Sequence, residues 1–233
     1  MESTIITAAE LKKYEKRFIV NENLGSYDEF RDSFMLFASD VMEDYQLTPE
    51  IEFILKQIYA QIAGYDFYKI DPRTGKPILA KEKDRYKGFF IAGPTGTGKT
   101  TFSKIVLDLI GAIGTKYIFD DHIYLLCGRY TSEQSLIREY MKTGDTVFMK
   151  NGSLYIDDIG QGREVIYMGN KIDPIREIVT ERYDNLKYTF TFFTSNYPID
   201  HQQLVTNYGE RVADRILSMC NYYTIKGKNF RRE

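Results

Sequence analysis

Several residue types that mark particular classes of protein are scarce in this sequence of 233 residues. There are two cysteines, Cys127 and Cys220, and their spacing forms neither a disulfide framework nor a zinc-binding pattern. The two histidines, His122 and His201, lie far apart in the sequence and belong to no metal-ligand pattern. These absences argue against a disulfide-stabilised secreted domain and against a metal site built from Cys and His.

The sequence also lacks an excess of charge of one sign. Lys and Arg number 31 and Asp and Glu number 33, so the net charge of −2 provides no overall basic surface for nucleic acid. Any contact with nucleic acid must therefore come from a local patch. No apolar run reaches the length of a membrane span and the first residues lack a signal peptide, which predicts a cytoplasmic protein. A hydrophobic content of 43% is enough for the core of one ordinary domain with an appendage.

The clearest positive signal is a glycine-rich octapeptide. Gly93 to Thr100 reads GPTGTGKT and fits the phosphate-binding P-loop pattern GxxxxGK(S/T). An apolar strand, Gly88 to Ala92, precedes it and an amphipathic helix follows, whereas a merely flexible Gly/Thr turn would need neither. Glycines let backbone N–H groups face a phosphate chain, Lys99 reaches the outer phosphates, and the Thr100 hydroxyl holds Mg²⁺. The predicted nucleotide-binding residues are Gly93, Pro94, Thr95, Gly96, Thr97, Gly98, Lys99, Thr100 and Thr101.

Apolar segments alternate with helical patterns beyond this loop, which predicts an α/β fold in which helices cover both faces of a parallel sheet. One predicted helix is capped by Thr131, with Gln134 reaching back, and stops at Gly144. Another has Asp173 as its N-cap and Pro174 at its first position. The predicted strands are His122 to Cys127, Ser153 to Ile156 and Thr189 to Thr194.

The chain before the P-loop is predicted to be helical. Thr48 is the expected N-cap of one helix, with Pro49 at its first position. A polar connector with Pro and Gly turns separates these helices from the P-loop strand. The predicted organisation is a helical N-terminal region over 1–63, a candidate partner-binding unit, then a linker over 64–85 and a nucleotide-binding domain over 86–233. The three expected helices are Ala8 to Phe18, Tyr27 to Tyr45 and Pro49 to Ala63.

Two later strand ends carry polar residues suited to phosphate chemistry. Asp157 and Asp158 follow an apolar strand in the Walker B arrangement, in which Asp157 holds Mg²⁺ through water and Asp158 orients the water that attacks the γ-phosphate. The strand at Thr189 to Thr194 leads into Ser195 and Asn196, whose amide can hydrogen-bond that water or the γ-phosphate. The alternatives are a solvated strand end for the two acids and an ordinary Asx turn for the asparagine.

Taken in order, these segments resemble a known family. GPTGTGKT, LYIDDIG, REIVTERYDN leading into TFFTSNYP, and YGERVADRI are similar to the AAA+ ATPases of the DnaC/DnaI type, the replicative helicase loaders, and to their IstB-like transposition relatives. The resemblance covers residues 86 to 232. It implies a P-loop NTPase with an AAA+ RecA-like core, ATP and Mg²⁺ as cofactors, a homo-oligomer on single-stranded DNA, and a replicative helicase or transposase as protein partner.

The resemblance also assigns roles to arginines. Arg215, in GERVADR, matches the arginine finger that reaches the γ-phosphate bound by the neighbouring subunit, and Arg211 is a competing candidate one turn earlier. Arg231 matches the sensor 2 arginine that acts on the bound nucleotide. DNA contacts are implied on helices that line a ring, which here include Arg129 and Arg138. The alternative for the helix of Arg215 is an exposed amphipathic surface.

The leading interpretation is therefore an ATP-hydrolysing helicase loader. Asp158 stands where many AAA+ proteins carry Glu, which is longer by one methylene, so we expect slow hydrolysis. Three alternatives stay open: an IstB-type transposition helper with the same motifs, a small-molecule P-loop kinase, and an adaptor that uses ATP only as a structural ligand. In the leading interpretation the catalytic residues are Lys99, Asp158, Asn196 and Arg215, and the metal-binding residues are Thr100 and Asp157.

Overall fold

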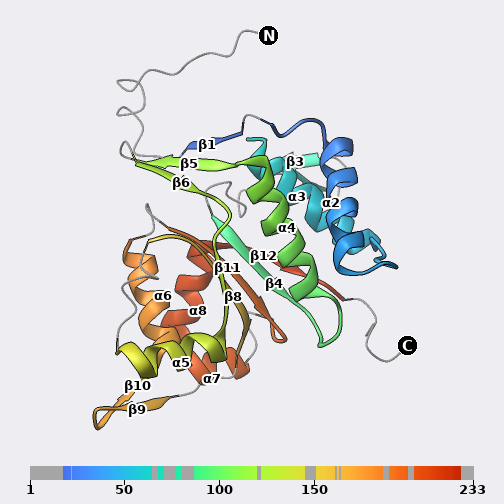
Figure 1. Ribbon diagram of the computed structural model, residues 1–233. Helices are drawn as coiled ribbons and strands as arrows, with labels where there is room; N and C mark the ends of the chain where they lie inside the picture. The colour runs from blue at the N-terminus through green and yellow to red at the C-terminus, as the bar shows by residue number, and fades with distance from the viewer. Residues whose placement is uncertain are drawn as a thin grey trace.

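A five-stranded parallel sheet lies at the centre of the computed structural model, with strand order β12-β4-β11-β8-β7 (Figure 1). The predicted α/β fold with a parallel sheet is confirmed. The five strands are β4 (Gly88–Ala92), β7 (Arg129–Ser132), β8 (Gly152–Ile159), β11 (Thr189–Ser195) and β12 (Cys220–Thr224). The structure describes residues 18–21, 23–64, 68–70, 77–79, 87–119, 122–144, 151–160, 162, 164–185, 189–198 and 202–226.

One face of this sheet is covered by the helices that precede and follow the P-loop strand, on the right of Figure 1. Phe89 and Ile91 of β4 and Phe192 of β11 are buried in this layer. Phe34 of α2 contacts Phe102 of α4 with ring centroids 5.6 Å apart, so the N-terminal helices share one core with the P-loop helix. The helices of this layer are α2 (Tyr27–Val41), α3 (Pro49–Ile62) and α4 (Lys99–Ile113).

The opposite face is covered by the helices from the second half of the chain. Phe90 of β4 and Phe193 of β11, which alternate with the residues of the first layer, pack into a second apolar cluster. Because both faces are buried, β4 is a nearly continuous apolar run and β11 contains only phenylalanine, threonine and serine, and this made them predictable. The helices of the second layer are α5 (Glu133–Thr143), α6 (Pro174–Asp184), α7 (Gln202–Tyr208) and α8 (Glu210–Met219).

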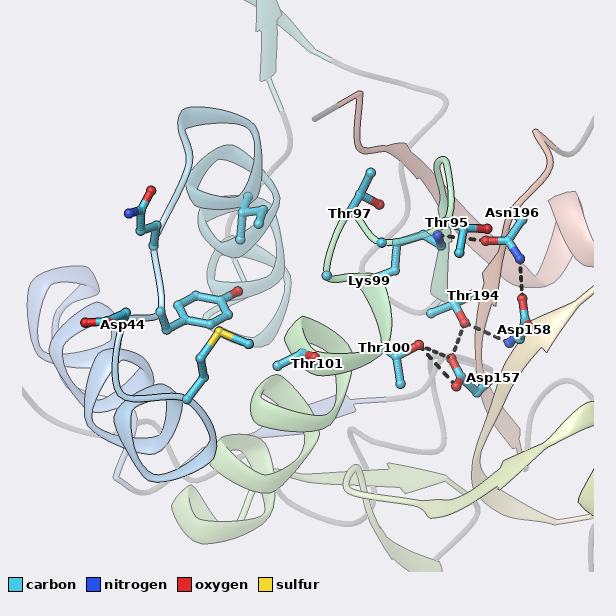
Figure 2. Close-up of a pocket in the computed structure, with 16 residues that line it drawn as sticks. Asp44, Thr95, Thr97, Lys99, Thr100, Thr101, Asp157, Asp158, Thr194 and Asn196 are labelled. Atoms are coloured by element: carbon cyan, nitrogen blue, oxygen red, sulfur yellow. Dashed lines mark hydrogen bonds between the residues drawn. The ribbon is translucent and has the colours of Figure 1, made fainter. Parts of the chain in front are cut away.

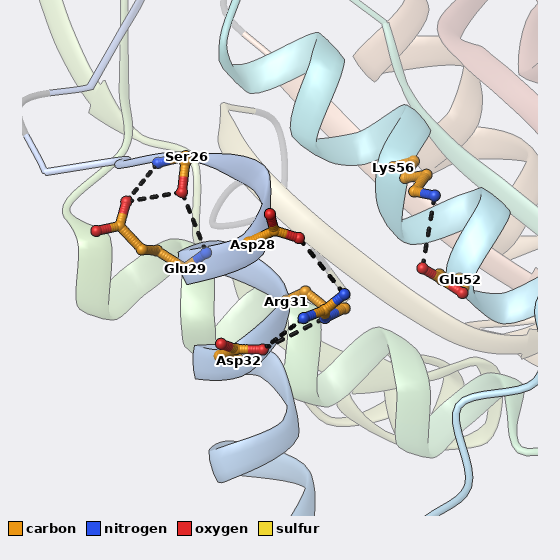
Figure 3. A network of polar contacts seen from close by, with 7 residues as sticks. All are labelled: Ser26, Asp28, Glu29, Arg31, Asp32, Glu52 and Lys56. Carbon is orange, nitrogen blue, oxygen red and sulfur yellow. Dashed lines mark hydrogen bonds and ion pairs between the residues drawn. The ribbon is translucent and has the colours of Figure 1, made fainter.

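Local hydrogen bonds set the first residues of the N-terminal helices. The Ser26 side chain accepts the Glu29 backbone N–H, and the Glu29 carboxylate accepts the Ser26 backbone N–H at 2.7 Å, which forms a capping box (Figure 3). The Ser26 hydroxyl also donates to the Glu29 carboxylate at 2.9 Å, and the two hydrogen bonds to this carboxylate, from the Ser26 backbone and side chain, lower the pKa of Glu29. Thr48 caps α3 and Pro49 is its first residue, as predicted.

The described residues also form three smaller sheets, all of them antiparallel. One contains three strands and the other two are pairs. The hairpin of β9 and β10 projects at the lower left of Figure 1. Their strands are β1 (Phe18–Val20), β5 (Lys116–Phe119) and β6 (His122–Leu125), then β2 (Tyr68–Ile70) with β3 (Pro77–Leu79), and β9 (Val165–Tyr167) with β10 (Asn170–Ile172).

The prediction that His122 to Cys127 joins the parallel sheet is wrong. Its strand, β6, pairs antiparallel with β5 in the three-stranded sheet. The edge strand beside β8 is β7, whose polar sequence RYTS carries no apolar signal. Thr131 therefore lies in β7, and Ser132 is the residue that caps α5, by accepting the Ser135 backbone N–H at 3.2 Å.

The N-terminal predictions are borne out only in part. The second predicted helix ends at Val41, because Met42 has an extended backbone, and does not continue to Tyr45. Phe18 begins β1 and does not end a helix, while 8–17 of that predicted helix lie outside the described residues. The division into an N-terminal region, a linker over 64–85 and a nucleotide-binding domain stays a prediction. No helix in the described part of the chain is long and apolar enough to cross a membrane.

Candidate active site

The predicted site residues lie at one edge of the central sheet, where parallel strands end together. The P-loop follows β4, the two acids lie just before the last residue of β8, and Asn196 follows β11, with Ala92 and Ile159 both paired to Ser195. This edge is where open α/β sheets bind ligands. A cavity of about 470 Å³ opens there, and its lining includes Thr95, Gly96, Thr97, Gly98, Lys99, Thr100, Thr101, Asp157, Asp158, Thr194 and Asn196.

The P-loop has the backbone that a phosphate cradle needs. Gly98 has φ of 81°, a left-handed conformation that strains other residues, and it precedes α4 without a side-chain cap. The first N–H groups of α4, with the positive end of its dipole, are therefore left for a ligand, and no acidic residue lies in the first turn. At Gly93 an added Cβ would lie 2.3 Å from the Ile225 carbonyl oxygen, so a side chain does not fit there.

A chain of hydrogen bonds joins the predicted catalytic side chains Lys99, Asn196 and Asp158 (Figure 2). The buried Lys99 ammonium donates to the carbonyls of Gly93 at 2.7 Å and Pro94 at 2.9 Å, and to Asn196 Oδ1 at 3.1 Å. Asn196 Nδ2 in turn donates to Asp158 Oδ1 at 2.7 Å. The site thus holds a cation, an amide and a carboxylate in contact beside the P-loop.

An irregular backbone places Asp158. Its φ is 56°, in the left-handed region that non-glycine residues rarely adopt, and the pairing of β8 with β11 shifts register at the same point. Such a bulge re-aims the side chains of a strand. Here the carboxylate of Asp158 lies against Asn196 beyond the end of β11.

Four hydroxyl groups surround the other acid, Asp157, whose side chain is buried. Thr100 Oγ1 donates to Oδ1 at 2.9 Å, Tyr155 donates to Oδ1 at 2.9 Å, and Tyr130 donates to Oδ2 at 2.9 Å. The Thr194 hydroxyl is the fourth donor. Burial raises the pKa of Tyr130, and its hydrogen bond to Asp157 raises it further, so this hydroxyl stays a donor at neutral pH.

Thr194 connects the two acids, which sequence reasoning did not anticipate. Its Oγ1 accepts the backbone N–H of Asp158 at 2.9 Å while its hydroxyl donates to Asp157. Tyr130 and Tyr155 were missed as well, because each reads as an ordinary aromatic residue of a strand. The signal available for Thr194 was its hydroxyl, two positions before Asn196 near the end of an apolar strand.

The loop between α2 and α3 forms the cavity wall opposite these residues. Its side chains line the cavity together with Ile51 of α3, and Figure 2 shows Asp44 across the cavity from Asn196. The Tyr45 hydroxyl is buried and has no hydrogen-bond partner among the described residues. The predicted N-terminal region therefore contributes to the cavity, which its sequence did not indicate. The contributing residues of the loop are Met42, Asp44, Tyr45 and Gln46.

The predicted finger arginine lies elsewhere. Arg215 of α8 donates to the Thr180 hydroxyl, approaches Asp184 Oδ1 at 3.9 Å and covers the Tyr183 ring at 5.3 Å, all on α6 of the same chain. Arg211, one turn earlier, is exposed. The structure therefore does not bring Arg215 to the site residues of its own chain. Its role as a finger for a neighbouring subunit stays a prediction.

Other predicted arginines are not tested by this geometry. Arg231 lies outside the described residues. Arg129 pairs with Glu139 at 3.9 Å, with both side chains about half exposed, and Arg138 is exposed on α5. Their roles in nucleotide and DNA binding stay predictions.

The residues at the sheet edge fit a nucleoside triphosphate with a divalent cation. The P-loop and Lys99 supply the donors and positive charge for phosphates, while Thr100 and Asp157 present the oxygen ligands that Mg²⁺ prefers. No group of three or more His, Cys, Asp or Glu that would hold a metal ion by itself occurs in the described ranges. A cation at this position therefore needs further oxygens from phosphate and water.

Comparison with known proteins agrees with this architecture. No protein-family model and no curated protein sequence matches the chain. Among solved structures, the DnaC helicase loader aligns with a TM-score of 0.51 at 20% identity over 80% of this chain and 96% of that chain. The structure of DnaI aligns with a TM-score of 0.49 at 20% identity over 79% of this chain and 90% of that chain. The chain therefore shares its fold with the DnaC helicase loader, which confirms the predicted P-loop fold.

Proposed function

We propose that this protein is an AAA+ ATPase that acts as a nucleotide-controlled helicase loader in DNA replication. The observation that carries the proposal is the set of contacts at the sheet edge, where Lys99, Asn196 and Asp158 form one hydrogen-bonded chain beside Thr100 and Asp157. The fold shared with the DnaC helicase loader supports the biological role.

Catalysis in this proposal relies on position and charge. Lys99 neutralises the outer phosphates, Thr100 and Asp157 hold Mg²⁺, and Asp158 orients the attacking water with the help of Asn196. Bound Mg²⁺ supplies the charge that stabilises the phosphoryl oxygens. Because the Asp158 side chain is short, slow hydrolysis suited to a switch is part of the proposal.

The variant Lys99→Ala tests the nucleotide site. It removes the ammonium that contacts the P-loop and Asn196, so we expect at least about tenfold weaker binding of a fluorescent ATP analogue and loss of phosphate release. Lys56→Ala is the matched control, because Lys56 pairs with Glu52 at 3.5 Å on the outside of α3 and does not line the cavity (Figure 3). Affinity and turnover at the wild-type level in Lys99→Ala would contradict the assignment.

A homo-oligomer with a finger from the neighbouring subunit is part of the proposal. Mixing Arg215→Ala with Lys99→Ala protein should restore part of the ATPase activity, because one mixed interface then contains an intact site. Arg211→Ala in the same mixing experiment tests the competing residue, which is the more exposed of the two. If assembly is intact and neither mixture recovers activity, the finger is not on α8.

Turnover also separates the other classes of function. Phosphate release without an acceptor excludes a kinase, and measurable turnover excludes an adaptor that binds ATP only as a structural ligand. We further propose that 1–63 contact the protein partner and that single-stranded DNA modulates turnover. Loading of a replicative helicase onto DNA by the full chain, measured beside the response to a transposase, separates a helicase loader from an IstB-type helper.

A further inference from the structure

A buried carboxylate outside the cavity lining holds the segment that follows the two site acids. Glu133, the first residue of α5, is 1% exposed. Its Oε2 accepts the N–H of Gly160 at 3.1 Å, and its Oε1 accepts the N–H of Gly162 at 3.1 Å and the Tyr208 hydroxyl at 2.9 Å. A buried charge is costly without such donors, and the N-terminal end of α5 stabilises it further.

Two residues of helix α7 form hydrogen bonds with the same segment. The Tyr208 hydroxyl accepts the N–H of Gly160 at 2.7 Å, and Asn207 Nδ2 donates to the Gly160 carbonyl. Burial raises the pKa of Tyr208, and the Glu133 charge adds to this effect, so the hydroxyl stays protonated and can donate to Glu133. The backbone at Gly160 is thus held by α5 and α7 together.

The residues just before Gly160 are held by β11. Thr194 accepts the N–H of Asp158 at 2.9 Å, and Ser195 Oγ donates to the Ile159 carbonyl at 2.7 Å. Asp158 therefore lies between two sets of fixed contacts. A left-handed backbone strains a non-glycine residue and persists only where its surroundings impose it.

We propose that Glu133, together with Tyr208, is a positioning residue for ATP hydrolysis. It fixes the backbone at Gly160 and Gly162 and thereby keeps the Asp158 carboxylate at Asn196, where it orients the attacking water. The proposal rests on the proposed ATPase function of the site. Since neither Glu133 nor Tyr208 lines the cavity, they act on the hydrolytic step and not on nucleotide binding.

This arrangement makes hydrolysis sensitive to two surface helices. Glu133 belongs to α5, which carries the exposed Arg138, and Tyr208 ends α7, directly before the helix that carries Arg215. A ligand or neighbouring subunit that moves either helix would shift the backbone beside Asp158 without touching the nucleotide.

The test compares Glu133→Gln and Tyr208→Phe with Glu139→Gln, a control on the same helix as Glu133 whose side chain is 42% exposed. Glutamine keeps the size of the side chain but replaces one acceptor oxygen by a donor. We expect ATP affinity within about twofold of the wild type, and kcat lower by about tenfold, the effect of losing one hydrogen bond to a charged group. Affinity for ADP with aluminium fluoride should fall by a similar factor, and the amide hydrogens of Gly160 and Gly162 should exchange faster. Glu139→Gln should change none of these.

The outcomes separate positioning from a general structural role. A wild-type kcat together with faster amide exchange at Gly160 would overturn the proposal, as would a parallel loss of ATP affinity and kcat. If Glu133→Gln does not fold, Tyr208→Phe decides by the same readouts. If the wild type binds ATP but shows no turnover, the proposed function fails, and affinity for ADP with aluminium fluoride then decides the positioning claim alone.

Discussion

Replacing Thr194 by valine isolates the hydroxyl that connects the two acids of the site. Valine has nearly the same shape as threonine, and the position is 1% exposed, so the change removes polar contacts without opening a cavity. The backbone N–H of Asp158 loses its acceptor, and Asp157 loses one of its four hydroxyl donors. We therefore expect both lower stability and lower turnover.

The contacts that are lost set the size of the effect. A buried N–H without a partner costs about 1–3 kcal/mol, and a hydrogen bond to a charged group contributes about 1.5–3 kcal/mol. The two terms share one hydroxyl and do not add fully, so we expect a loss of about 3 kcal/mol in the free energy of unfolding. For a chain of this size this corresponds to a fall in Tm of about 6–12 °C. Turnover should fall by about tenfold as Asp158 loses its anchor.

Urea unfolding and phosphate release measure these two effects, and Thr194→Ser is the matched control. Serine keeps the hydroxyl and loses one methyl group, which costs about 1 kcal/mol in a buried position. Serine should therefore keep most of the activity. If valine were as stable and active as the wild type, or if serine were as damaging as valine, the bridging role of the hydroxyl would be refuted.

Three further predictions concern groups around the site and the fold. Arg182→Met should lower the free energy of unfolding by about 3 kcal/mol, because the buried guanidinium donates to two strand carbonyls at the end of the sheet opposite the cavity. Burial lowers the pKa of this guanidinium to about 10. ATP affinity should stay unchanged, and weaker ATP binding would contradict this. Tyr130→Phe should weaken Mg²⁺-dependent nucleotide binding by about tenfold through loss of its hydrogen bond to Asp157, and an unchanged Mg²⁺ requirement would count against it. Because hydrogen bonds lower the pKa of Glu29, its contribution to stability is present above the ordinary glutamate pKa and is lost as the pH falls through the lowered value. Glu29→Gln should therefore reduce the loss of stability as the pH falls in the acid range, and a loss equal to that of the wild type would contradict this.

The fold was predictable where the burial of a segment shows directly in its residue types. β4 and β11 are buried on both faces, so the apolar run of β4 and the phenylalanines of β11 identified them. Thr48 with Pro49 marked the first turn of α3. β7 was not predicted, because an edge strand with the sequence RYTS lacks an apolar signal. The apolar run at β6 was assigned to the wrong sheet, because an apolar run does not reveal its pairing partners.

The site was predictable to the extent that adjacent residues carry its chemistry. Lys99, Thr100, Asp157, Asp158 and Asn196 were all predicted, and they lie together because parallel strands end at one edge. The supporting groups depend on contacts between distant segments. For example, Glu133 reads in the sequence as an ordinary acid in the first turn of a helix, but the fold buries it against Gly160 and Gly162.

The most direct test of the central claim is steady-state phosphate release by Asp158→Asn, measured together with ATP affinity. Asparagine tolerates the left-handed backbone of this position and still accepts the Asn196 hydrogen bond, but it lacks the charge that orients water. We predict that ATP affinity stays within about twofold of the wild type while kcat falls by at least about 100-fold. Turnover at the wild-type rate in this variant would contradict the account of the site.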